Sequence, residues 1–281
     1  MTSDQNLDTV DMMLNMGPQH PSTHGVFRMV LTIDGESIVD VEPHIGYLHR
    51  GSEKLCEAED YRQIIDLFDR LDYLSSFNNE LPYVMAVEKL MGLEVPERAQ
   101  YIRLIMCELN RIASHLLFYG AFGADCGAIT PFLYGFKERE RIQSLFESVS
   151  GARMMHGYFR IGGVFRELPE GFNKSLADLL QEVEKGVTEC QDLLSKNELF
   201  LERTMGIGLI DTETALDYGM SGPNLRATGI DIDLRKDEPY LLYESLQFEV
   251  PIGLNGDCFD RYTVRMEEIW QSISIIKQAI R

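Results

Sequence analysis

The stretch FDRYTVRMEEIWQSISIIKQAI, residues 259–280, has the most regular hydrophobic pattern in the chain. Its apolar side chains recur at steps of three and four residues without a break: Phe259, Tyr262, Met266, Ile269, Ile273, Ile276 and Ile280. This spacing places them on one face of an α-helix. Such a seam predicts a helix that packs lengthwise against a neighbouring helix.

Helical periods also fill much of the sequence before this stretch. After Pro96, apolar residues at helical spacing run from Ile102 to Leu116, and a second series runs from Phe172 to about Asn197. We also expect helices at residues 52–68, 78–91 and 132–149. Between Thr204 and Gly256 the helical period disappears, and glycine, proline and aspartate predict loops with short strands.

The N-terminal part follows a different period. From Phe27 to Ile33 apolar and polar residues alternate, Asp34-Gly35 supplies a turn, and Ile38 to Val41 returns. This is the pattern of a β-hairpin. The sequence therefore predicts a mainly α fold with a small N-terminal antiparallel β-sheet (α+β). We expect an N-terminal loop and hairpin segment over residues 1–50 and a helical core over 51–281.

Composition excludes several classes of protein. The 281 residues are 44% hydrophobic and 25% charged, which is typical of a globular protein and not of a disordered one. With 26 basic and 45 acidic side chains the net charge is −19, so binding to nucleic acid is not expected. The five cysteines form no C-x-x-C pair, and the N-terminus does not resemble a secretory signal.

The segment from Leu116 to Phe136 contains a single charge, Asp125. Its length would suit a membrane span, but Pro131 and four glycines interrupt it, so we expect buried structure instead. A carboxylate in such surroundings needs a partner. Asp125 is thus a surface turn residue, a buried acid paired with arginine or histidine, or a group that exchanges protons.

Four of the six histidines, His20, His24, His44 and His49, fall within two loops rich in glycine and proline. They are either metal ligands or loop histidines that hydrogen-bond to the backbone, and no nearby thiolate or E-x-x-H completes a metal set. The pattern around Tyr73 is more typical of a core residue than of a catalytic one. Gly206-Ile-Gly208 is too incomplete to predict a nucleotide site.

Several longer blocks resemble one family. They are GPQHPSTHG (17–25), EPHIGYLHRGSEK (42–54), YIRLIMCELNRIASHLL (101–117), GAITPFLYGFKERE (127–140), GARMMHGYFRIGGV (151–164), SGPNLRATGIDIDLRK (221–236) and the terminal IIKQAI (275–280). In this order they are similar to the 49 kDa subunit of respiratory complex I, known as the D subunit, or the H subunit in the photosynthetic NDH-1 relatives. The resemblance implies a catalytic-core subunit of a proton-translocating NADH-quinone oxidoreductase.

The resemblance also implies descent from the large subunit of nickel–iron hydrogenases, with a similar helical core. In those proteins two C-x-x-C pairs hold the metal. Aligning Ala86-Val-Glu-Lys89 places Asp72 and Ser75 at the first pair of thiolate positions. A carboxylate and a hydroxyl do not replace soft thiolates, so a nickel site is not expected.

In the family the vacated cavity receives a quinone headgroup beside the terminal [4Fe-4S] cluster of a small partner subunit. Carried over, the headgroup ligands are His24 and Tyr73, and Asp125 is the partner of His24. Two donors aimed at the quinone carbonyls would stabilise the charge that reduction delivers and could supply protons. The resemblance implies that quinone is a substrate and that this chain holds no cluster, flavin or metal.

Arg50 resembles the arginine that the family places near the cluster, and Arg70 and Arg160 are weaker candidates for the same role. Many respiratory members carry histidine where this chain has Met155, with His156 next. A pH-dependent cluster potential through that histidine is therefore in doubt, and a structural role for His156 is an equal alternative.

The implied partners are the small iron–sulfur subunit, a 30 kDa-type subunit and subunits of the membrane arm. The chain would lie peripherally on the cytoplasmic side of the cell membrane or of an equivalent energy-transducing membrane. The resemblance implies that the C-terminal part of the family's domain is missing from this sequence. Two alternatives remain: a truncated, non-catalytic scaffold copy and a hydrogenase-like large subunit.

Overall fold

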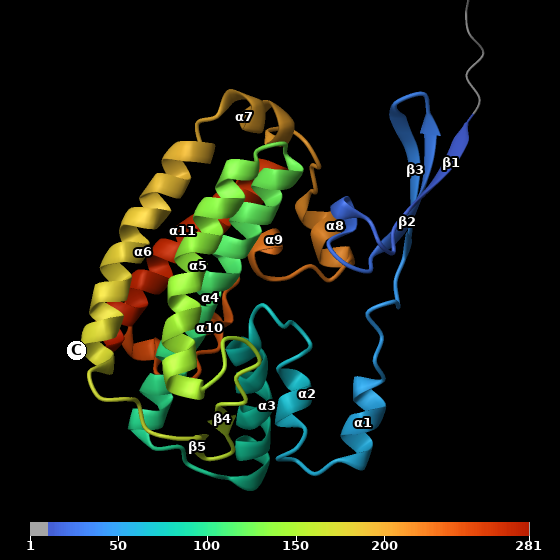
Figure 1. Cartoon of the computed structure of the whole chain (residues 1–281). Helices are drawn as coiled ribbons and strands as arrows, with labels where there is room; N and C mark the ends of the chain where they lie inside the picture. Colours follow the sequence, from blue (N-terminus) through green and yellow to red (C-terminus); the bar gives the residue numbers. More distant parts are fainter. Residues whose placement is uncertain (1–10, 281) are drawn as a thin grey trace, which may run out of the picture. The chain divides into compact units, whose positions relative to one another are not determined.

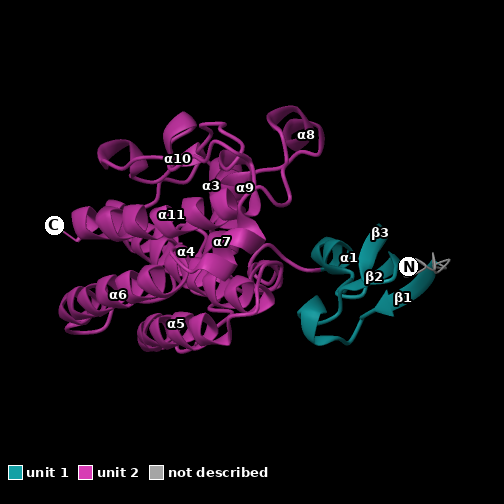
Figure 2. Cartoon of the chain, turned by 90° about the horizontal axis from the view of Figure 1, so that it is seen from above, with its two compact units in different colours: residues 1–58 teal, residues 59–281 magenta. Residues whose placement is uncertain are grey.

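The computed structural model of the chain describes residues 11–280 and is mainly helical (Figure 1). It divides into two compact units, residues 1–58 (unit 1) and 59–281 (unit 2), which Figure 2 shows in different colours. The predicted fold class, mainly α with a small antiparallel sheet near the N-terminus, is confirmed.

Unit 1 contains a three-stranded antiparallel sheet in the order β1-β2-β3, with β1 at Met12–Met16, β2 at Arg28–Asp34 and β3 at Ser37–His44. The predicted hairpin is β2 and β3, and Gly35 takes the positive φ of +62° that its turn requires. Strand β1, which pairs Leu14 with Leu31, was not predicted from the sequence pattern. A 3-10 helix, Pro21–Thr23, and helix α1, Ser52–Ala58, complete the unit.

The expected helix over 52–68 is broken into α1 and α2 (Ile65–Phe68). The break has a local cause at Asp60. Its carboxylate accepts hydrogen bonds from the backbone N–H groups of Arg62 and Gln63, at 2.8 and 3.1 Å. This side chain offers the backbone an alternative to helical hydrogen bonds.

Four long helices form the centre of unit 2 (Figures 1 and 2). They are α4 (Glu97–Asp125), α5 (Ile129–Ser150), α6 (Phe172–Leu194) and α11 (Cys258–Ala279). Helix α4 packs against α5 and α11, and α6 packs against the same two helices. The predicted seam is confirmed, because Ile269, Ile273 and Ile276 are buried in this core.

Shorter elements surround the bundle. Helix α3 (Ser76–Met91) packs on α4, and the two-stranded ribbon of β4 (Phe159–Arg160) and β5 (Gly163–Val164) contacts both helices. Helix α7 (Glu198–Thr204) contacts α11.

Between Thr204 and Gly256 the expectation of short strands is wrong. This segment forms α8 (Thr212–Asp217), α9 (Gly222–Arg226), α10 (Leu234–Asp237) and a 3-10 turn at Tyr243–Ser245. Aspartates start two of these helical turns: Asp211 accepts from the N–H of Thr214 at 2.7 Å, and Asp233 from that of Arg235 at 2.9 Å. A carboxylate at such a position favours a helical start over an extended chain.

The segment from Leu116 to Phe136 joins two helices of the bundle. It comprises the end of α4, a turn at 126–128 and the start of α5. Its glycines allow close packing: a Cβ on Gly135 would lie 2.6 Å from the carbonyl oxygen of Leu116. Within residues 11–280, no helix combines the length and the apolar character needed to cross a membrane.

Candidate functional site

His24 lies in unit 1 at the end of the 3-10 helix Pro21–Thr23, with left-handed backbone angles (φ 47°, ψ 44°). Two backbone interactions hold this loop. The N–H of Thr23 donates to the carbonyl of His20 at 3.1 Å, and His20 forms an isolated antiparallel β-bridge with Gly25. The left-handed conformation costs free energy in a residue other than glycine, and it persists only where the surrounding structure imposes it. The loop therefore holds the exposed His24 in one backbone conformation.

The other histidines of these loops do not gather around a metal site. His20 Nδ1 accepts a hydrogen bond from the backbone of Ser22 at 3.1 Å, which matches the alternative of a backbone-bonded loop histidine. His44 Nε2 lies 3.4 Å from a carboxylate oxygen of Glu42. In the described part of the chain, no three His, Cys, Asp or Glu side chains are grouped as metal ligands. Arg50, also in unit 1, is exposed.

Tyr73 lies in unit 2, in the turn between α2 and α3. The turn is held by hydrogen bonds from Ser75 N to Asp72 O at 2.9 Å and from Asn110 Nδ2, on α4, to Leu74 O at 3.2 Å. The interpretation of Tyr73 as a core residue is wrong, because 39% of its surface is exposed. The turn instead presents the phenol outward while its backbone is anchored to α4.

The two positions expected to replace thiolates serve this same turn. A carboxylate oxygen of Asp72 accepts from the backbone N–H of Leu74 at 3.2 Å, and the hydroxyl of Ser75 accepts from Asn78 at 2.9 Å. Both side chains therefore have local structural partners.

Asp125 is the last residue of α4 and is exposed. Of the alternatives considered for Asp125, its position matches a residue at a surface turn and not a buried acid: the helix ends there, at the turn into α5. Asn110, which anchors the turn of Tyr73, precedes Asp125 by fifteen residues on the same helix, or about 22 Å along its axis. Tyr73 and Asp125 thus lie at different levels of the bundle.

Arg70 and Arg160, the weaker candidates, are both half-buried in unit 2. Arg70 donates to the carbonyl of Asp66 at 2.5 Å. Arg160 donates to its neighbour's carbonyl and lies over the ring of Phe165, 5.1 Å from its centroid.

His156 has a structural environment. It is buried, and its ring stacks on Phe77 with 4.0 Å between centroids. Its Nδ1 lies 3.2 Å from the carbonyl oxygen of Ala152. Burial lowers the pKa of His156 to about 4, so the ring is neutral at pH 7.

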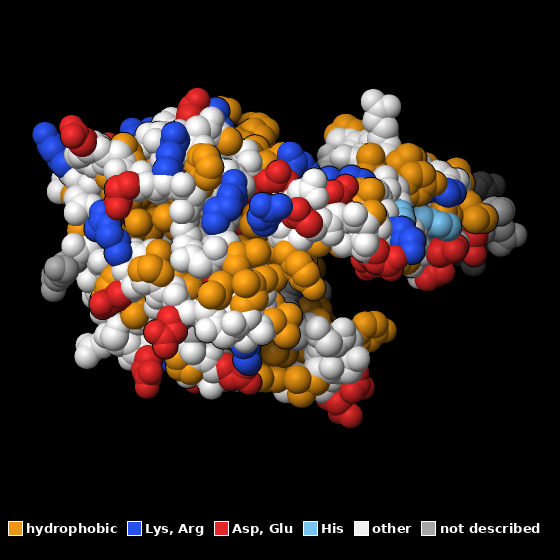
Figure 3. All heavy atoms as spheres, turned by 90° about the horizontal axis from the view of Figure 1, so that it is seen from below, with side chains coloured by type: hydrophobic (Ala, Val, Ile, Leu, Met, Phe, Trp, Pro, Cys, Tyr) orange, Lys and Arg blue, Asp and Glu red, His pale blue; other side chains and the backbone are white. Residues whose placement is uncertain are grey.

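Hydrophobic side chains also reach the surface. Figure 3 shows them gathered between acidic and basic side chains on one face of the molecule. At the end of α3, the exposed fractions are 82% for Leu90, 61% for Met91 and 42% for Leu93. Exposed apolar groups that follow one another in this way are typical of surfaces that other chains cover.

A cavity of about 960 Å³ lies in unit 2 between α3, α4 and the segment around α10. Its lining residues are Ser75, Asn78, Leu81, Pro82, Met85, Ala86, Lys89, Arg111, Ser114, His115, Leu234, Glu238, Pro239 and Tyr240. Ser75, one of these lining residues, belongs to the turn that carries Tyr73. Helix α4 contributes Arg111 and His115 to this lining. The cavity is therefore lined partly by apolar side chains and partly by a guanidinium and an imidazole.

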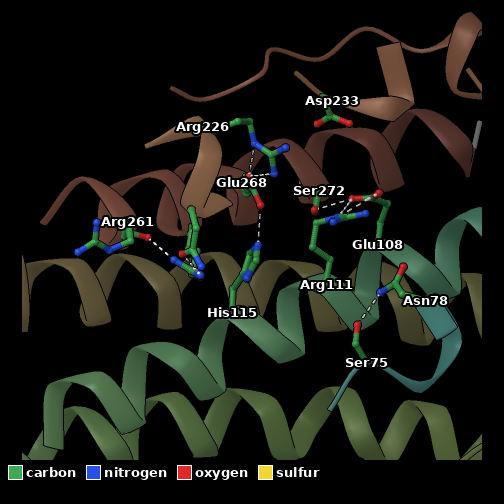
Figure 4. Close-up of polar contacts among 12 residues, drawn as sticks. Ser75, Asn78, Glu108, Arg111, His115, Arg226, Asp233, Arg261, Glu268 and Ser272 are labelled. Carbon is green, nitrogen blue, oxygen red and sulfur yellow. Dashed lines mark hydrogen bonds and ion pairs between the residues drawn. The ribbon is translucent and has the colours of Figure 1, made fainter. Parts of the chain in front are cut away.

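Behind this lining, α4 and α11 share buried charges (Figure 4). Nε2 of His115 lies 2.7 Å from Glu268, whose other carboxylate oxygen accepts from Arg226 of α9 at 2.5 and 3.0 Å. Burial lowers the pKa of His115, and the hydrogen bond to Glu268, which acts in the opposite direction, does not offset this effect. Glu268 is buried too, but its bonds to His115 and Arg226 lower its pKa below the usual range. The arrangement is an ionised Glu268 with a neutral imidazole.

Glu108, three residues before Arg111 on α4, is the centre of a second cluster of buried charges. It accepts hydrogen bonds of 2.5 Å each from Tyr243 and Ser272, and Arg235 lies at 3.2 Å. Burial alone would raise the pKa of Glu108. The charges of Arg111 and Arg235 and these hydrogen bonds outweigh that effect and lower it to about 2.

These charges are not among the candidates taken from the sequence. The signal for them was Glu108, Arg111 and His115 at steps of three and four on an otherwise apolar helix, a spacing that puts all three on one face. Buried charges need partners, so this face already implied counter-charges elsewhere. Their identity required the tertiary structure.

Comparison with known proteins shows clear similarity. Residues 125–281 match the family described as the 49 kDa subunit of the respiratory-chain NADH dehydrogenase. The NADH-quinone oxidoreductase D subunit of Clostridium beijerinckii is 54% identical over 280 residues, which cover the whole chain and 76% of that protein. The proteins of the same name from Geotalea uraniireducens and Methylacidiphilum infernorum are each 53% identical over 269 residues, covering 96% of the chain and 69% and 64% of those proteins.

Proposed function

Because the chain belongs to the family of the NADH-quinone oxidoreductase D subunit, we propose that it lines the quinone-reduction site of such an enzyme, next to the terminal iron–sulfur cluster of a small partner subunit. The observation that carries this proposal is the turn of Tyr73. It holds an exposed phenol between Asp72 and Ser75, at the place where a hydrogenase would carry thiolates. The chain itself holds no flavin, cluster or metal in this proposal.

The chemistry of the substrate suits the two proposed donors. A quinone has two carbonyl oxygens, and two-electron reduction places negative charge on both. The phenol of Tyr73 donates to one oxygen and the imidazole of His24 to the other, which stabilises this charge and supplies protons. The exposed phenol and the loop that fixes His24 support these roles.

Asp125 and Arg50 have supporting roles in this proposal. The carboxylate of Asp125 orients the imidazole of His24 and favours its cationic form. Arg50 places a positive charge near the partner's cluster, which favours the reduced state. Both side chains are exposed, which supports roles in which they act on groups outside the core of their own unit.

Assembly with other subunits follows from the same proposal. The small iron–sulfur subunit, the 30 kDa-type subunit and the membrane arm would cover exposed apolar surface such as that of Leu90 and Met91. The chain would then lie on the cytoplasmic side of the membrane, and proton translocation would begin with the charge changes at the quinone.

Tyr73→Phe in the assembled complex tests the site. Loss of the phenolic donor is expected to reduce quinone reduction by about a hundredfold, while the subunits still co-purify. Tyr134→Phe is the matched control, because Tyr134 has a similar exposed fraction, 38%, on α5 of the same unit. It should leave the rate unchanged.

Full quinone reduction in the Tyr73→Phe complex would exclude Tyr73 as a headgroup ligand. A wild-type complex that assembles with iron but never reduces quinone would favour the scaffold alternative. Nickel in the purified complex would favour the hydrogenase-like alternative.

A further inference from the structure

Two acidic side chains of unit 2 face one another inside the protein. Asp69 follows α2 and is 1% exposed, and Glu80 lies on α3 and is 0% exposed. Their carboxyl groups lie within hydrogen-bonding reach of each other. Two buried carboxylates at this separation would repel strongly if both were ionised.

The outer oxygens of this pair bind one short stretch of backbone. One oxygen of Asp69 accepts from the N–H of Gly157 at 2.8 Å. One oxygen of Glu80 accepts from the next two N–H groups, Tyr158 at 3.0 Å and Phe159 at 2.6 Å. Three consecutive backbone donors are thus shared between the two carboxyl groups.

The inner oxygens have no such donor. Oδ1 of Asp69 and Oε1 of Glu80 are buried, and neither has a hydrogen-bond partner among the described residues as long as both groups are counted as acceptors. A buried polar atom without a partner costs free energy. One hydrogen placed between these two oxygens would satisfy both.

We propose that Asp69 and Glu80 form a buried proton-binding site, in which a single proton bridges the two inner oxygens and fastens the backbone of residues 157–159 to α3. In this state one group is a carboxylic acid that donates and the other a carboxylate that accepts. The pair carries one negative charge in total.

The surrounding charges fit one retained proton. Asp66 on α2 adds negative charge and Arg70 adds positive charge near Asp69. On α4, the buried thiol of Cys107 is uncharged at pH 7, because burial and the nearby negative charges of Glu108 and Glu80 raise its pKa. From the segment after α5, His156 is neutral at pH 7 and Tyr158 is a phenol with its pKa raised to about 12. Burial raises the pKa of both carboxyl groups, and for Glu80 the hydrogen bond to Asp69 raises it further.

This site closes the turn that presents Tyr73. The hydroxyl of Ser76 donates to the backbone carbonyl of Asp69 at 3.1 Å, so the residue that carries one carboxyl group of the bridge is tied to the far end of the turn. Loss of the bridging proton would leave two charges at its base. If the proposed function holds, quinone reduction should weaken at the same pH at which the bridge is lost.

Amide substitutions in the full chain test the bridge. In Glu80→Gln, the amide oxygen can accept from residues 158 and 159, and the NH2 group can donate to Asp69. In Asp69→Asn, the amide likewise replaces the acid, and Glu80 becomes the acceptor. Each single variant keeps one donor between the inner atoms and is expected to retain the folding equilibrium constant within about tenfold.

In the double variant, no arrangement of the two amides pairs a donor with an acceptor at every position. Asp69→Asn with Glu80→Gln places two NH2 groups face to face, and turning either amide opposes a backbone N–H instead. We expect a loss of about a hundredfold beyond the sum of the single effects in urea unfolding at pH 7. Additive effects would overturn the proposal.

The pH dependence provides a second measurement. The folded wild type holds one proton that the unfolded chain releases above about pH 5, so its folding equilibrium constant should fall by about tenfold more per pH unit than that of Glu80→Gln, until the bridge deprotonates. The wild type should also show the infrared carbonyl band of a protonated carboxyl group, which Glu80→Gln lacks. Equal slopes and no such band would mean that no proton is shared.

Glu88→Gln is the matched control on the same helix. Glu88 is buried as well, but its carboxyl oxygens accept from the guanidinium of Arg103, at 2.6 and 3.0 Å. Here an amide leaves a buried guanidinium without its counter-charge, and a loss of several hundredfold, about that of a broken buried pair, is expected. If Glu80→Gln costs as much as Glu88→Gln, then the amide does not take the place of a bridging proton and the proposal fails.

Discussion

Single buried carboxylates in unit 2 depend on cations from distant parts of the sequence. Glu108 on α4 is the clearest example, because Arg235 reaches it from α10, 127 residues further along the chain. The pair is desolvated, so its attraction is stronger than that of a surface pair, but removing one partner leaves an uncompensated charge.

Glu108→Gln should therefore destabilise the protein. We expect the free energy of unfolding at pH 7 to fall by about 3–5 kcal/mol, measured by urea unfolding. Glu202→Gln, an exposed acid on α7, is the control and should change it by less than about 0.5 kcal/mol.

The same residue predicts an acid transition. The folded pKa of Glu108, about 2, lies below its unfolded value of 4.5, so its stabilisation is present above about pH 4.5 and is lost as the pH falls towards 2. The shift corresponds to about 3 kcal/mol. Unfolding curves at pH 7 and pH 3 should show part of this loss in the wild type and less of it in Glu108→Gln.

His156 should titrate well below other histidines. Its folded pKa of about 4 lies below the usual 6.5, so the neutral ring is favoured in the fold and stability is lost as the pH falls from about 6.5 to 4. Nuclear magnetic resonance of the ring protons, assigned with His156→Asn, should show a ring that is mostly neutral above pH 5. A midpoint near 6.5 would contradict the buried, stacked position.

At the scale of elements, the close approach of α4 and α5 is set by glycine. A Cβ at position 135 would lie 2.6 Å from the carbonyl oxygen of Leu116 and 3.1 Å from the ring of Tyr119. Both contacts are shorter than normal packing allows, and one partner is backbone that cannot rotate away.

Gly135→Ala tests this contact. Alanine gains about 1 kcal/mol of helix propensity over glycine, whereas overpacking costs about 1–3 kcal/mol and here meets rigid backbone. We expect a net loss of about 1–2 kcal/mol in thermal or urea unfolding. Gly163→Ala is the control, because its Cβ would meet only Ala99, at 3.8 Å. Greater stability of Gly135→Ala would show that the helices separate easily.

The two short helices α9 and α10 supply the cations of the buried ion pairs. Helix α9 ends with Arg226 and α10 contains Arg235, and these two side chains reach Glu268 and Glu108. Elements of four or five residues are not stable alone. Their place on the bundle is fixed by these buried ion pairs.

At the scale of the whole molecule, the proposed function predicts a coupling defect. In the assembled complex, Asp125→Asn should lower the number of protons translocated per electron, because a neutral amide cannot stabilise a cationic His24. Proteoliposomes with a pH-sensitive dye measure this ratio. Asp217→Asn, an exposed acid on α8, is the control. An unchanged ratio in Asp125→Asn would exclude this role for Asp125.

Periodicity in the sequence was enough to predict the long helices and the hairpin. The seam from Phe259 to Ile280 and the alternation in β2 and β3 are local patterns, and local patterns persist because each side chain's face is set by backbone geometry alone. The family, too, could be identified from the long sequence blocks alone. Where the pattern was weak, as between Thr204 and Gly256, short capped helices replaced the expected strands.

Only the tertiary structure decided burial and pairing. Asp125 had three alternatives and lies exposed at a surface turn, Tyr73 was expected in the core and is exposed, and Asp69 and Glu80 are buried against each other. The reason is physical: burial and the partner of a charge depend on residues far away in the chain, which no local period encodes. The sequence determined which segments are helices, and packing between those helices determined which acids keep their charge and which retain a proton.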